Sequence, residues 1–211
     1  MRRAVTAAGV VVVAGVALAA GYYLSRTDDG AAATQAGPTS TGRTVPEMRP
    51  EFSLADASGQ QRSITEWDGR PLLINFWATW CPPCRREIPL LNSLRGRYGP
   101  RGYEVIGVAV DFREDVLAYM KETPIEYPIL IGEQDGLDAA RAFGMETMGF
   151  PFTIFTDRLG RIVTVHVGEL HASQADAILQ AVGEVDAGKL AIEAARIRIR
   201  AELAAIPAGD S

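Results

Sequence analysis

The residues with the clearest chemical potential are Cys81 and Cys84, which are the only cysteines in this 211-residue chain. The two residues between them, Pro82 and Pro83, bring the thiols close enough to close a small disulfide ring at the start of a helix. Unpaired N–H groups and the helix dipole favour a thiolate at such a position, and the thiolate is the nucleophile of thiol–disulfide exchange. We therefore expect Cys81 to attack a partner disulfide and the more buried Cys84 to resolve the mixed disulfide.

The two prolines bear on the direction of this chemistry. Pro83 is shaped for an early helical position, and two successive prolines remove two N–H groups that could stabilise the thiolate of Cys81. A less stabilised thiolate corresponds to a more reducing thiol pair. The sequence thus predicts a pair that gives up electrons readily.

Two other interpretations of the cysteine pair are a structural disulfide and a metal site. A disulfide that closes a two-residue loop adds little stability, because the entropic gain grows with loop length. A metal site needs more ligands than two thiols, and neither His166 nor His171 is near them in the sequence. We expect a redox-active pair with no metal and no cofactor.

The composition excludes several other classes of protein. The chain has 21 basic and 26 acidic residues, a net charge of −5 and a pI near 5.1, which argues against a general nucleic-acid binder. Hydrophobic residues make up 47% of the chain and charged residues 22%, which is ordinary for a globular protein and argues against wholesale disorder. Two cysteines are also too few for a disulfide-stapled scaffold.

The amino-terminal segment predicts a membrane signal. Residues 4–24 carry no charge and follow Arg2 and Arg3. A helix of that length is about 32 Å long, enough to cross a bilayer core of about 30 Å with its arginines in the cytoplasm. We interpret residues 1–24 as a retained signal-anchor helix. The alternative is a signal peptide cleaved after Ala17-Leu18-Ala19, and in both cases the rest of the chain is exported.

Two further regions follow the anchor. Residues 25–46 lack aliphatic periodicity and are expected to form a flexible linker, and residues 47–172 are expected to form an α/β domain. Alternating strands and helices in that domain favour a mostly parallel sheet covered by helices. Its predicted elements are a hairpin at 51–64, strands at 72–77, 105–110, 128–131, 152–155 and 162–167, and helices from 82, at 112–121 and at 136–143.

Residues 173–211 are predicted to form a helical extension. Ser173 begins the first helix, with Asp176 in the position of a capping box. A second helix follows Gly188 and would either fold back on the domain or bind a partner or a membrane surface. Its apolar residues at helical spacing are Leu190, Ala194, Ile197 and Ala201.

The segment NFWATWCPPCRREIP at 75–89 resembles the active-site strand and helix of thioredoxin-like proteins. It is most similar to the TlpA/ResA branch of membrane-tethered thiol–disulfide oxidoreductases. The similarity extends from about Pro50 to Leu170 and includes a later Gly-x-Pro motif that ends at Pro151. It implies a thioredoxin fold with a central mixed sheet flanked by helices, an amino-terminal β-hairpin and a central βα insertion.

The resemblance also assigns substrate-contact residues. Pro151 matches the cis-proline of the family, which would place the backbone of Phe150 beside the cysteines to pair with an extended substrate. Trp80, Pro82 and Pro83 are the neighbouring residues expected to contact that substrate. Trp80 is expected to be exposed, whereas the other nearby tryptophan is expected to pack in the core.

The resemblance points to Glu87 as a third catalytic residue, because the reductase branch uses an acidic residue near the thiols. A desolvated carboxylate with a raised pKa would accept the proton of Cys84. The alternative for Glu87 is an exposed helix charge. Asn75 stands where thioredoxin itself has an ionisable aspartate, so a general base has to lie elsewhere.

The expected function is reduction of disulfides in exported proteins by a single-pass protein of the cytoplasmic membrane whose catalytic domain is extracytoplasmic. The resemblance implies clients such as apocytochrome c and an upstream membrane thiol reductase of the DsbD/CcdA kind. Three rivals are a thiol oxidase, a peroxiredoxin-like peroxidase and a non-enzymatic module that binds metal or a partner through its thiols. The peroxidase family places Thr three residues and Pro seven residues before its cysteine, where this chain has Ala78 and Ile74.

Overall fold

The computed structural model describes residues 45–145 and 149–206. The expected signal anchor at 1–24 and all but the last two residues of the linker at 25–46 lie outside the described residues. Within the described ranges, no helix is long and apolar enough to cross a membrane.

The centre of the fold is a seven-stranded sheet with the order β2-β1-β5-β4-β3-β6-β7. The three strands β3, β4 and β5 run parallel, and every other neighbouring pair is antiparallel. The strands are β1 (Ser53–Asp56), β2 (Gln61–Ser63), β3 (Leu72–Trp77), β4 (Glu104–Val110), β5 (Ile129–Gly132), β6 (Phe152–Thr156) and β7 (Ile162–Val167).

The expectation of a mostly parallel sheet is therefore wrong, whereas the mixed sheet implied by the family resemblance is confirmed. The reason lies in the connections between strands. Strands β6 and β7 are joined by a tight turn that includes Gly160 at φ +77°, and so short a connection permits only antiparallel pairing. The hairpin of β1 and β2 likewise adds antiparallel strands beside β5.

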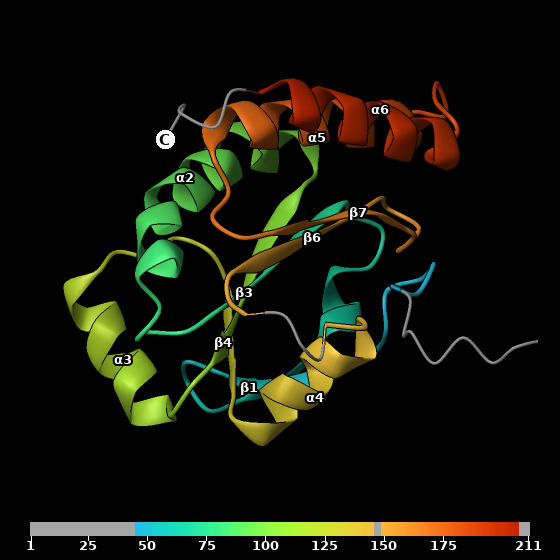
Figure 1. Ribbon diagram of the computed structural model, residues 1–211. Helices are drawn as coiled ribbons and strands as arrows, with labels where there is room; N and C mark the ends of the chain where they lie inside the picture. The colour runs from blue at the N-terminus through green and yellow to red at the C-terminus, as the bar shows by residue number, and fades with distance from the viewer. Residues whose placement is uncertain (1–44, 146–148, 207–211) are drawn as a thin grey trace, which may run out of the picture. The chain divides into compact units, whose positions relative to one another are not determined.

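Helices cover both faces of the sheet (Figure 1). Residues of α2, α3, α5 and α6 pack with one face in a core that includes Trp77 and both cysteines. Residues of α4 and η1 pack with the other face, around Phe76 and Phe143. The helices are η1 (Ile64–Trp67), α2 (Pro82–Tyr98), η2 (Gly99–Arg101), α3 (Arg113–Glu122), α4 (Gln134–Ala142), α5 (Ala172–Asp186) and α6 (Ile192–Ala205).

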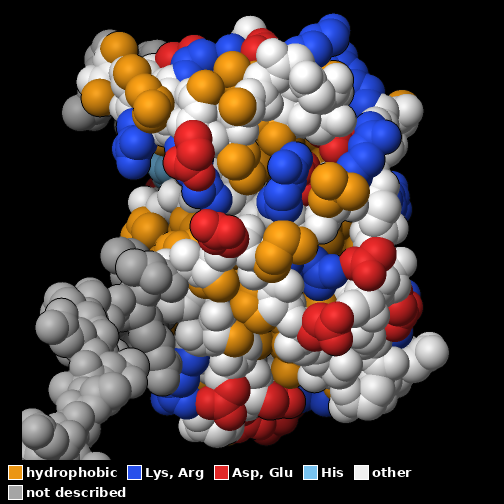
Figure 2. Space-filling view, turned by 90° about the vertical axis from the view of Figure 1, so that its right-hand side faces the viewer, with side chains coloured by type: hydrophobic (Ala, Val, Ile, Leu, Met, Phe, Trp, Pro, Cys, Tyr) orange, Lys and Arg blue, Asp and Glu red, His pale blue; other side chains and the backbone are white. Residues whose placement is uncertain are grey.

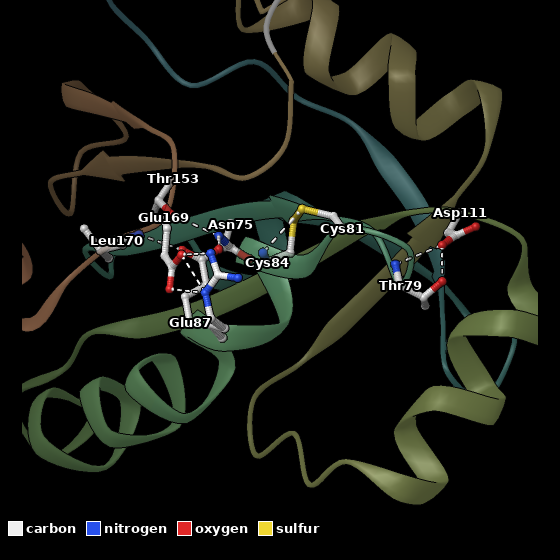
Figure 3. The surroundings of a disulfide bond; sticks show 10 residues. Asn75, Thr79, Cys81, Cys84, Glu87, Asp111, Thr153, Glu169 and Leu170 are labelled. Carbon is white, nitrogen blue, oxygen red and sulfur yellow. Dashed lines mark hydrogen bonds and ion pairs between the residues drawn. A yellow bond between two sulfur atoms is a disulfide. The ribbon is translucent and has the colours of Figure 1, made fainter. Parts of the chain in front are cut away.

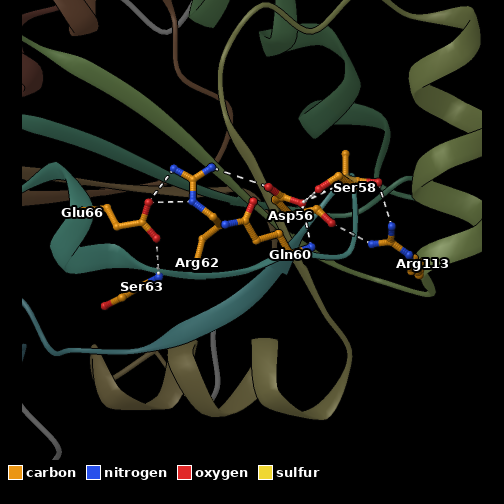
Figure 4. Close-up of polar contacts among 8 residues, drawn as sticks. Asp56, Ser58, Gln60, Arg62, Ser63, Glu66 and Arg113 are labelled. Atoms are coloured by element: carbon orange, nitrogen blue, oxygen red, sulfur yellow. Dashed lines mark hydrogen bonds and ion pairs between the residues drawn. The ribbon is translucent and has the colours of Figure 1, made fainter.

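The predicted amino-terminal hairpin is confirmed, and its turn is held by one carboxylate (Figure 4). Asp56 accepts hydrogen bonds from the N–H of Ser58 at 2.8 Å and from the N–H of Gln60 at 3.1 Å. Arg113, at the start of α3, donates to the backbone carbonyls of Asp56 and Ala57, each at 2.7 Å. The hairpin is thereby tied to the helix that follows β4.

Helix α5 begins earlier than predicted. His171 is its N-cap, and the side chain of Gln174 accepts a hydrogen bond from the His171 N–H at 3.0 Å. The expected Ser173–Asp176 capping box is therefore wrong, because Gln174 already satisfies the backbone at the true helix start. Asp176 instead forms an ion pair with Arg97 of α2 at 3.2 Å.

Helix α6 packs against α5 and β7. The predicted apolar face is wrong: Ile197 is 61% exposed, Ala194 and Ala201 are exposed, and the buried residues are Ala195 and Ile199. The helix is rotated because Arg196 turns toward the sheet and donates to the carbonyl of Ile162 at 2.7 Å.

Charges of both signs are mixed with apolar side chains on the face of the molecule seen in Figure 2. Some of the charged side chains form ion pairs with helix α5. Arg198 of α6 contacts Glu184 at 2.7 Å, and Arg158 of the β6–β7 turn contacts Asp186 at 2.5 Å. These pairs tie α6 and the β6–β7 turn to α5.

Candidate active site

The cysteine pair lies where β3 passes into α2. Cys81 is the N-cap of α2, and Pro82 is its first helical residue. The two sulfurs form a disulfide with an S–S distance of 2.03 Å, and the Cys84 N–H donates to the Cys81 sulfur at 3.3 Å. Cys84 is fully buried and Cys81 is 3% exposed, so Cys81 is the more accessible sulfur-bearing residue. This is the arrangement that the two-residue spacing predicted.

The residues expected to contact substrate surround this helix start. Trp80 is 67% exposed, and its ring lies 6.1 Å from the ring of Phe150. The peptide bond from Phe150 to Pro151 is cis. Pro82 is exposed and Pro83 is half-buried. The fold therefore gathers these five residues at one end of the domain although they come from two distant segments of the chain.

Glu87 is buried one helical turn beyond Cys84. Its side chain is directed inward from α2, and the residue is only 1% exposed. Asn75 of β3 donates to one carboxylate oxygen at 2.7 Å, and the Leu170 N–H donates to the other at 2.9 Å. Figure 3 shows this group on the Cys84 side of the disulfide. The alternative of an exposed helix charge is excluded.

The burial of Glu87 has a direct electrostatic consequence. Desolvation raises the pKa of Glu87 to about 7, although the hydrogen bonds from Leu170 and Asn75 favour the ionised form. The negative charge of Glu169 raises this pKa further. A carboxyl group with such a pKa can both accept and release a proton near neutral pH.

Two residues around the Glu87 site, Thr153 and Glu169, were not found from the sequence. Thr153 lies opposite Asn75 in the β3–β6 register and accepts a hydrogen bond from the Asn75 amide at 3.0 Å. Glu169, next to the Leu170 donor, binds Arg86 of α2 at 2.5 Å. These residues are brought together by strand pairing and loop packing, for which the local sequence carries no signal.

His166, which is distant from the cysteines in the sequence, also contacts this loop. The ring of His166 lies 3.2 Å from the backbone carbonyl of Glu169. Burial lowers the pKa of His166, which favours its neutral form. We regard His166 as a packing residue of the loop that supplies the Leu170 N–H.

A second carboxylate supports the other side of the disulfide. Asp111, at the end of β4, accepts from the Thr79 N–H at 2.9 Å and from the Thr79 hydroxyl at 2.5 Å (Figure 3). These bonds hold the loop that carries Trp80. Sequence analysis missed this contact, because β3 and β4 become neighbours only in the folded sheet.

The remaining sequence predictions concern packing and metals. Trp77 is 1% exposed, so the prediction that it packs in the core is confirmed. Across the described part of the chain, no group of three or more His, Cys, Asp or Glu side chains is placed to hold a metal ion.

Comparison with known proteins gives a consistent result. Residues 45–165 match the AhpC/TSA family. The thiol-disulfide oxidoreductase ResA of Halalkalibacterium halodurans is 31% identical over 137 residues, which cover 64% of this chain and 76% of that protein. The thioredoxin-like protein YneN of Bacillus subtilis is 34% identical over 130 residues, which cover 59% of this chain and 72% of that protein.

Solved structures agree with these relatives. The crystal structure of a thiol:disulfide interchange protein of the thioredoxin family from Chlorobium tepidum superposes with a TM-score of 0.53 at 27% identity. The match covers 72% of this chain and 99% of that one. The resemblance to the TlpA/ResA branch and the thioredoxin-like fold are thereby confirmed.

Proposed function

We propose that this chain, which belongs to the AhpC/TSA family, is an extracytoplasmic thiol–disulfide oxidoreductase that reduces disulfides in exported proteins. The observation that carries the proposal is the Cys81–Cys84 pair at the start of α2 with the buried carboxyl of Glu87 one turn further on. The names of the relatives and the cysteine motif support the same activity.

The first step forms a mixed disulfide. The Cys81 thiolate attacks one sulfur of a client disulfide, the client S–S bond breaks, and one client thiolate leaves. The start of α2 favours this thiolate through its N–H groups and dipole, and the Cys84 N–H is already directed at the Cys81 sulfur. The exposed ring of Trp80 and the segment around Phe150 provide the contact surface for the client.

The second step releases the client. Cys84 passes its thiol proton to the Glu87 carboxylate, and the resulting thiolate attacks the Cys81 sulfur. The mixed disulfide breaks and the second client thiolate leaves, so two electrons pass from the protein to the client. Glu87 suits this role because its raised pKa lies closer to that of a thiol than the pKa of an exposed glutamate does. Asn75 cannot ionise and instead holds the carboxylate in place.

The direction of electron flow follows from the two prolines and from the compartment. Pro82 and Pro83 withhold two N–H donors from the thiolate, which favours a reducing pair. A reductant outside the cytoplasm needs electrons from across the membrane, for which a membrane thiol reductase of the DsbD/CcdA kind is suited. We propose residues 1–24 as the membrane anchor and apocytochrome c as one client.

Trapping the mixed disulfide tests this function. The Cys84→Ala variant, purified from native membranes, is expected to carry an exported protein bound to Cys81 through a bond that dithiol reagents cleave. The matched control, Cys81→Ala, is expected to carry none. The wild-type protein is also expected to reduce insulin in the presence of a dithiol.

Two results would contradict the proposal. One is an absence of both trapped clients and insulin reduction. The other is rapid consumption of hydroperoxide, since peroxidase activity on the same fold is the principal rival. The positions of Ala78 and Ile74, where peroxidases have Thr and Pro, favour the reductase.

A further inference from the structure

A surface pocket lies next to the cysteine pair and takes no part in the exchange steps themselves. Its volume is about 350 Å³, and one wall is Trp80, the residue before Cys81. The other walls come from the two segments that follow β4 and β5 and lead into α3 and α4. Phe112 is the N-cap of α3, and Leu137 belongs to α4. A group bound here would contact the side chain that directly precedes Cys81 in the sequence.

The pocket concentrates exposed apolar surface. Trp80 is 67% exposed, Phe112 is 54% exposed and Leu137 is 38% exposed. Single exposed hydrophobic residues are ordinary on protein surfaces, whereas several that converge on one hollow mark an interaction site. The hydrogen bonds from Thr79 to Asp111 keep the loop of Trp80 in this position without any client.

The rim of the pocket is negatively charged. Asp111 and Glu133 are acidic, and none of the described residues that line the pocket is Lys or Arg. Asp111 is only 8% exposed and accepts hydrogen bonds from Thr79 and from the Phe112 N–H, so the accessible charge on the rim is that of the exposed Glu133. Arg113 lines an adjacent hollow with Asp111, Glu133 and Asp135, and its guanidinium group donates to the carbonyls of the β1–β2 turn.

We propose that this pocket selects clients in which a large apolar side chain and a Lys or Arg lie within a few residues of the attacked cysteine. The apolar side chain packs among Trp80, Phe112 and Leu137, and the cation meets the exposed carboxylate of Glu133. Such a client would match the pocket in charge as well as in apolar contact. This inference rests on the proposed reductase function and names the class of its substrate.

Three disulfide peptides that differ only beside one cysteine test the inference. The two residues after that cysteine are Phe-Lys, Ser-Lys or Phe-Glu. We expect kcat/KM for the Phe-Lys peptide to exceed that for the Ser-Lys peptide by about tenfold, because one large apolar side chain is removed from water. We expect it to exceed that for the Phe-Glu peptide by about threefold, and this smaller factor shrinks as salt is added.

Variants of the pocket assign the preference to particular residues. Phe112→Ser and Leu137→Ser are expected to bring the Phe-Lys and Ser-Lys peptides to within about twofold of each other. Glu133→Lys is expected to reverse the preference between Phe-Lys and Phe-Glu. The matched control is Leu159→Ser, which removes a 65% exposed apolar side chain outside the pocket and is expected to change neither ratio.

The peptide and variant measurements distinguish a failure of the pocket proposal from a failure of the proposed reductase function. Equal rates with all three peptides in the wild-type protein would overturn the pocket proposal and leave the reductase function standing. An absence of reduction with every peptide and with insulin would overturn the function itself. If Phe112→Ser instead dissolved a dimer and left the peptide ratios unchanged, the pocket would be an interface between two copies and the proposal would be wrong.

Discussion

Two buried glutamates on the same domain, Glu87 and Glu104, differ in their partners. Glu104, at the start of β4, binds Arg70 at 3.0 Å and Arg95 at 2.7 Å, so two guanidinium groups match its charge. Glu87 is more deeply buried, and its partners are a backbone N–H and the amide of Asn75. Hydrogen bonds from neutral groups do not offset the desolvation of Glu87, and burial raises its pKa to about 7.

The comparison shows that burial alone does not make a carboxylate suitable for proton transfer. A buried carboxylate with ion-pair partners is costly to remove because its guanidinium partners lose their counter-charge, whereas one with only neutral partners has its pKa raised toward neutrality. The same domain uses both arrangements, and only the second lies beside the cysteines. Changing each glutamate to its amide therefore tests the distinction directly.

The largest expected effect is on catalysis by Glu87. The Glu87→Gln variant is expected to reduce a protein disulfide about 100-fold more slowly than wild type at pH 7, because Cys84 loses its proton acceptor. The pH–rate profile is expected to lose the inflection near pH 7 that Glu87 provides. Stopped-flow measurement of single-turnover reduction from pH 5 to 9 gives both quantities.

Glu104→Gln is the matched control for that measurement, since it makes the same chemical change at a buried glutamate away from the thiols. Its pH–rate profile is expected to keep the wild-type shape. If Glu87→Gln retained both the rate and the inflection, its proposed role in proton transfer would be wrong.

The next effect concerns the stability of the oxidised protein as a function of pH. The pKa of Glu87 is about 7 in the folded protein, against an ordinary value of 4.5. As pH rises from 4.5 to 7, the unfolded chain loses this proton before the folded protein does, so the free energy of unfolding falls. The stabilising contribution of protonated Glu87 is present in full below pH 4.5 and is lost by pH 7. Its loss lowers the free energy of unfolding by about 3 kcal/mol.

Urea unfolding of oxidised wild type and oxidised Glu87→Gln at pH 4 and pH 8 measures this change. The variant cannot titrate at this position, so its stability relative to wild type is expected to rise by about 3 kcal/mol between the two pH values. A stability difference independent of pH would show that the Glu87 carboxyl titrates alike in the folded and unfolded states.

The smallest of these effects is the loss of the Glu104 ion pairs. Glu104→Gln is expected to lower the free energy of unfolding by about 2 kcal/mol, because it leaves two guanidinium groups without their carboxylate. The loss is moderate since the side chains of Arg70 and Arg95 remain 38% and 40% exposed to water. Thermal and urea unfolding measure it.

An exposed glutamate provides the reference for that stability measurement. Glu122→Gln, on the surface of α3, is expected to change stability by less than about 0.5 kcal/mol. Equal effects of Glu104→Gln and Glu122→Gln would mean that the buried ion pairs contribute no more than surface charges do.

Local patterns were sufficient to predict the elements that carry the site. The apolar runs at 72–77 and 162–167 coincide with β3 and β7, and Pro82 begins α2 as predicted. Strand β3 is recognisable because a strand buried on both faces reads as a continuous apolar run, and the start of α2 is recognisable from its prolines. The contrast between buried Trp77 and exposed Trp80 was also predicted correctly.

The features that the sequence did not predict depend on contacts between distant segments. The direction of β6 relative to β3 and the rotation of α6 are set by tertiary packing. The hydrogen bond from the Leu170 N–H to Glu87 likewise depends on a loop that approaches α2 only in the folded domain. The residue pattern of a single helix or strand does not indicate which distant segments will pack against it.

The way α6 meets the sheet has a consequence for the edge strand β7. The side chain of Arg196 binds the carbonyl of Ile162 at 2.7 Å, and the Ile162 N–H donates to the carbonyl of Glu47 at 2.8 Å. The backbone groups at this end of β7 are thus already engaged within one molecule. A second molecule is therefore hindered from extending the sheet there, which protects the protein against edge-to-edge aggregation.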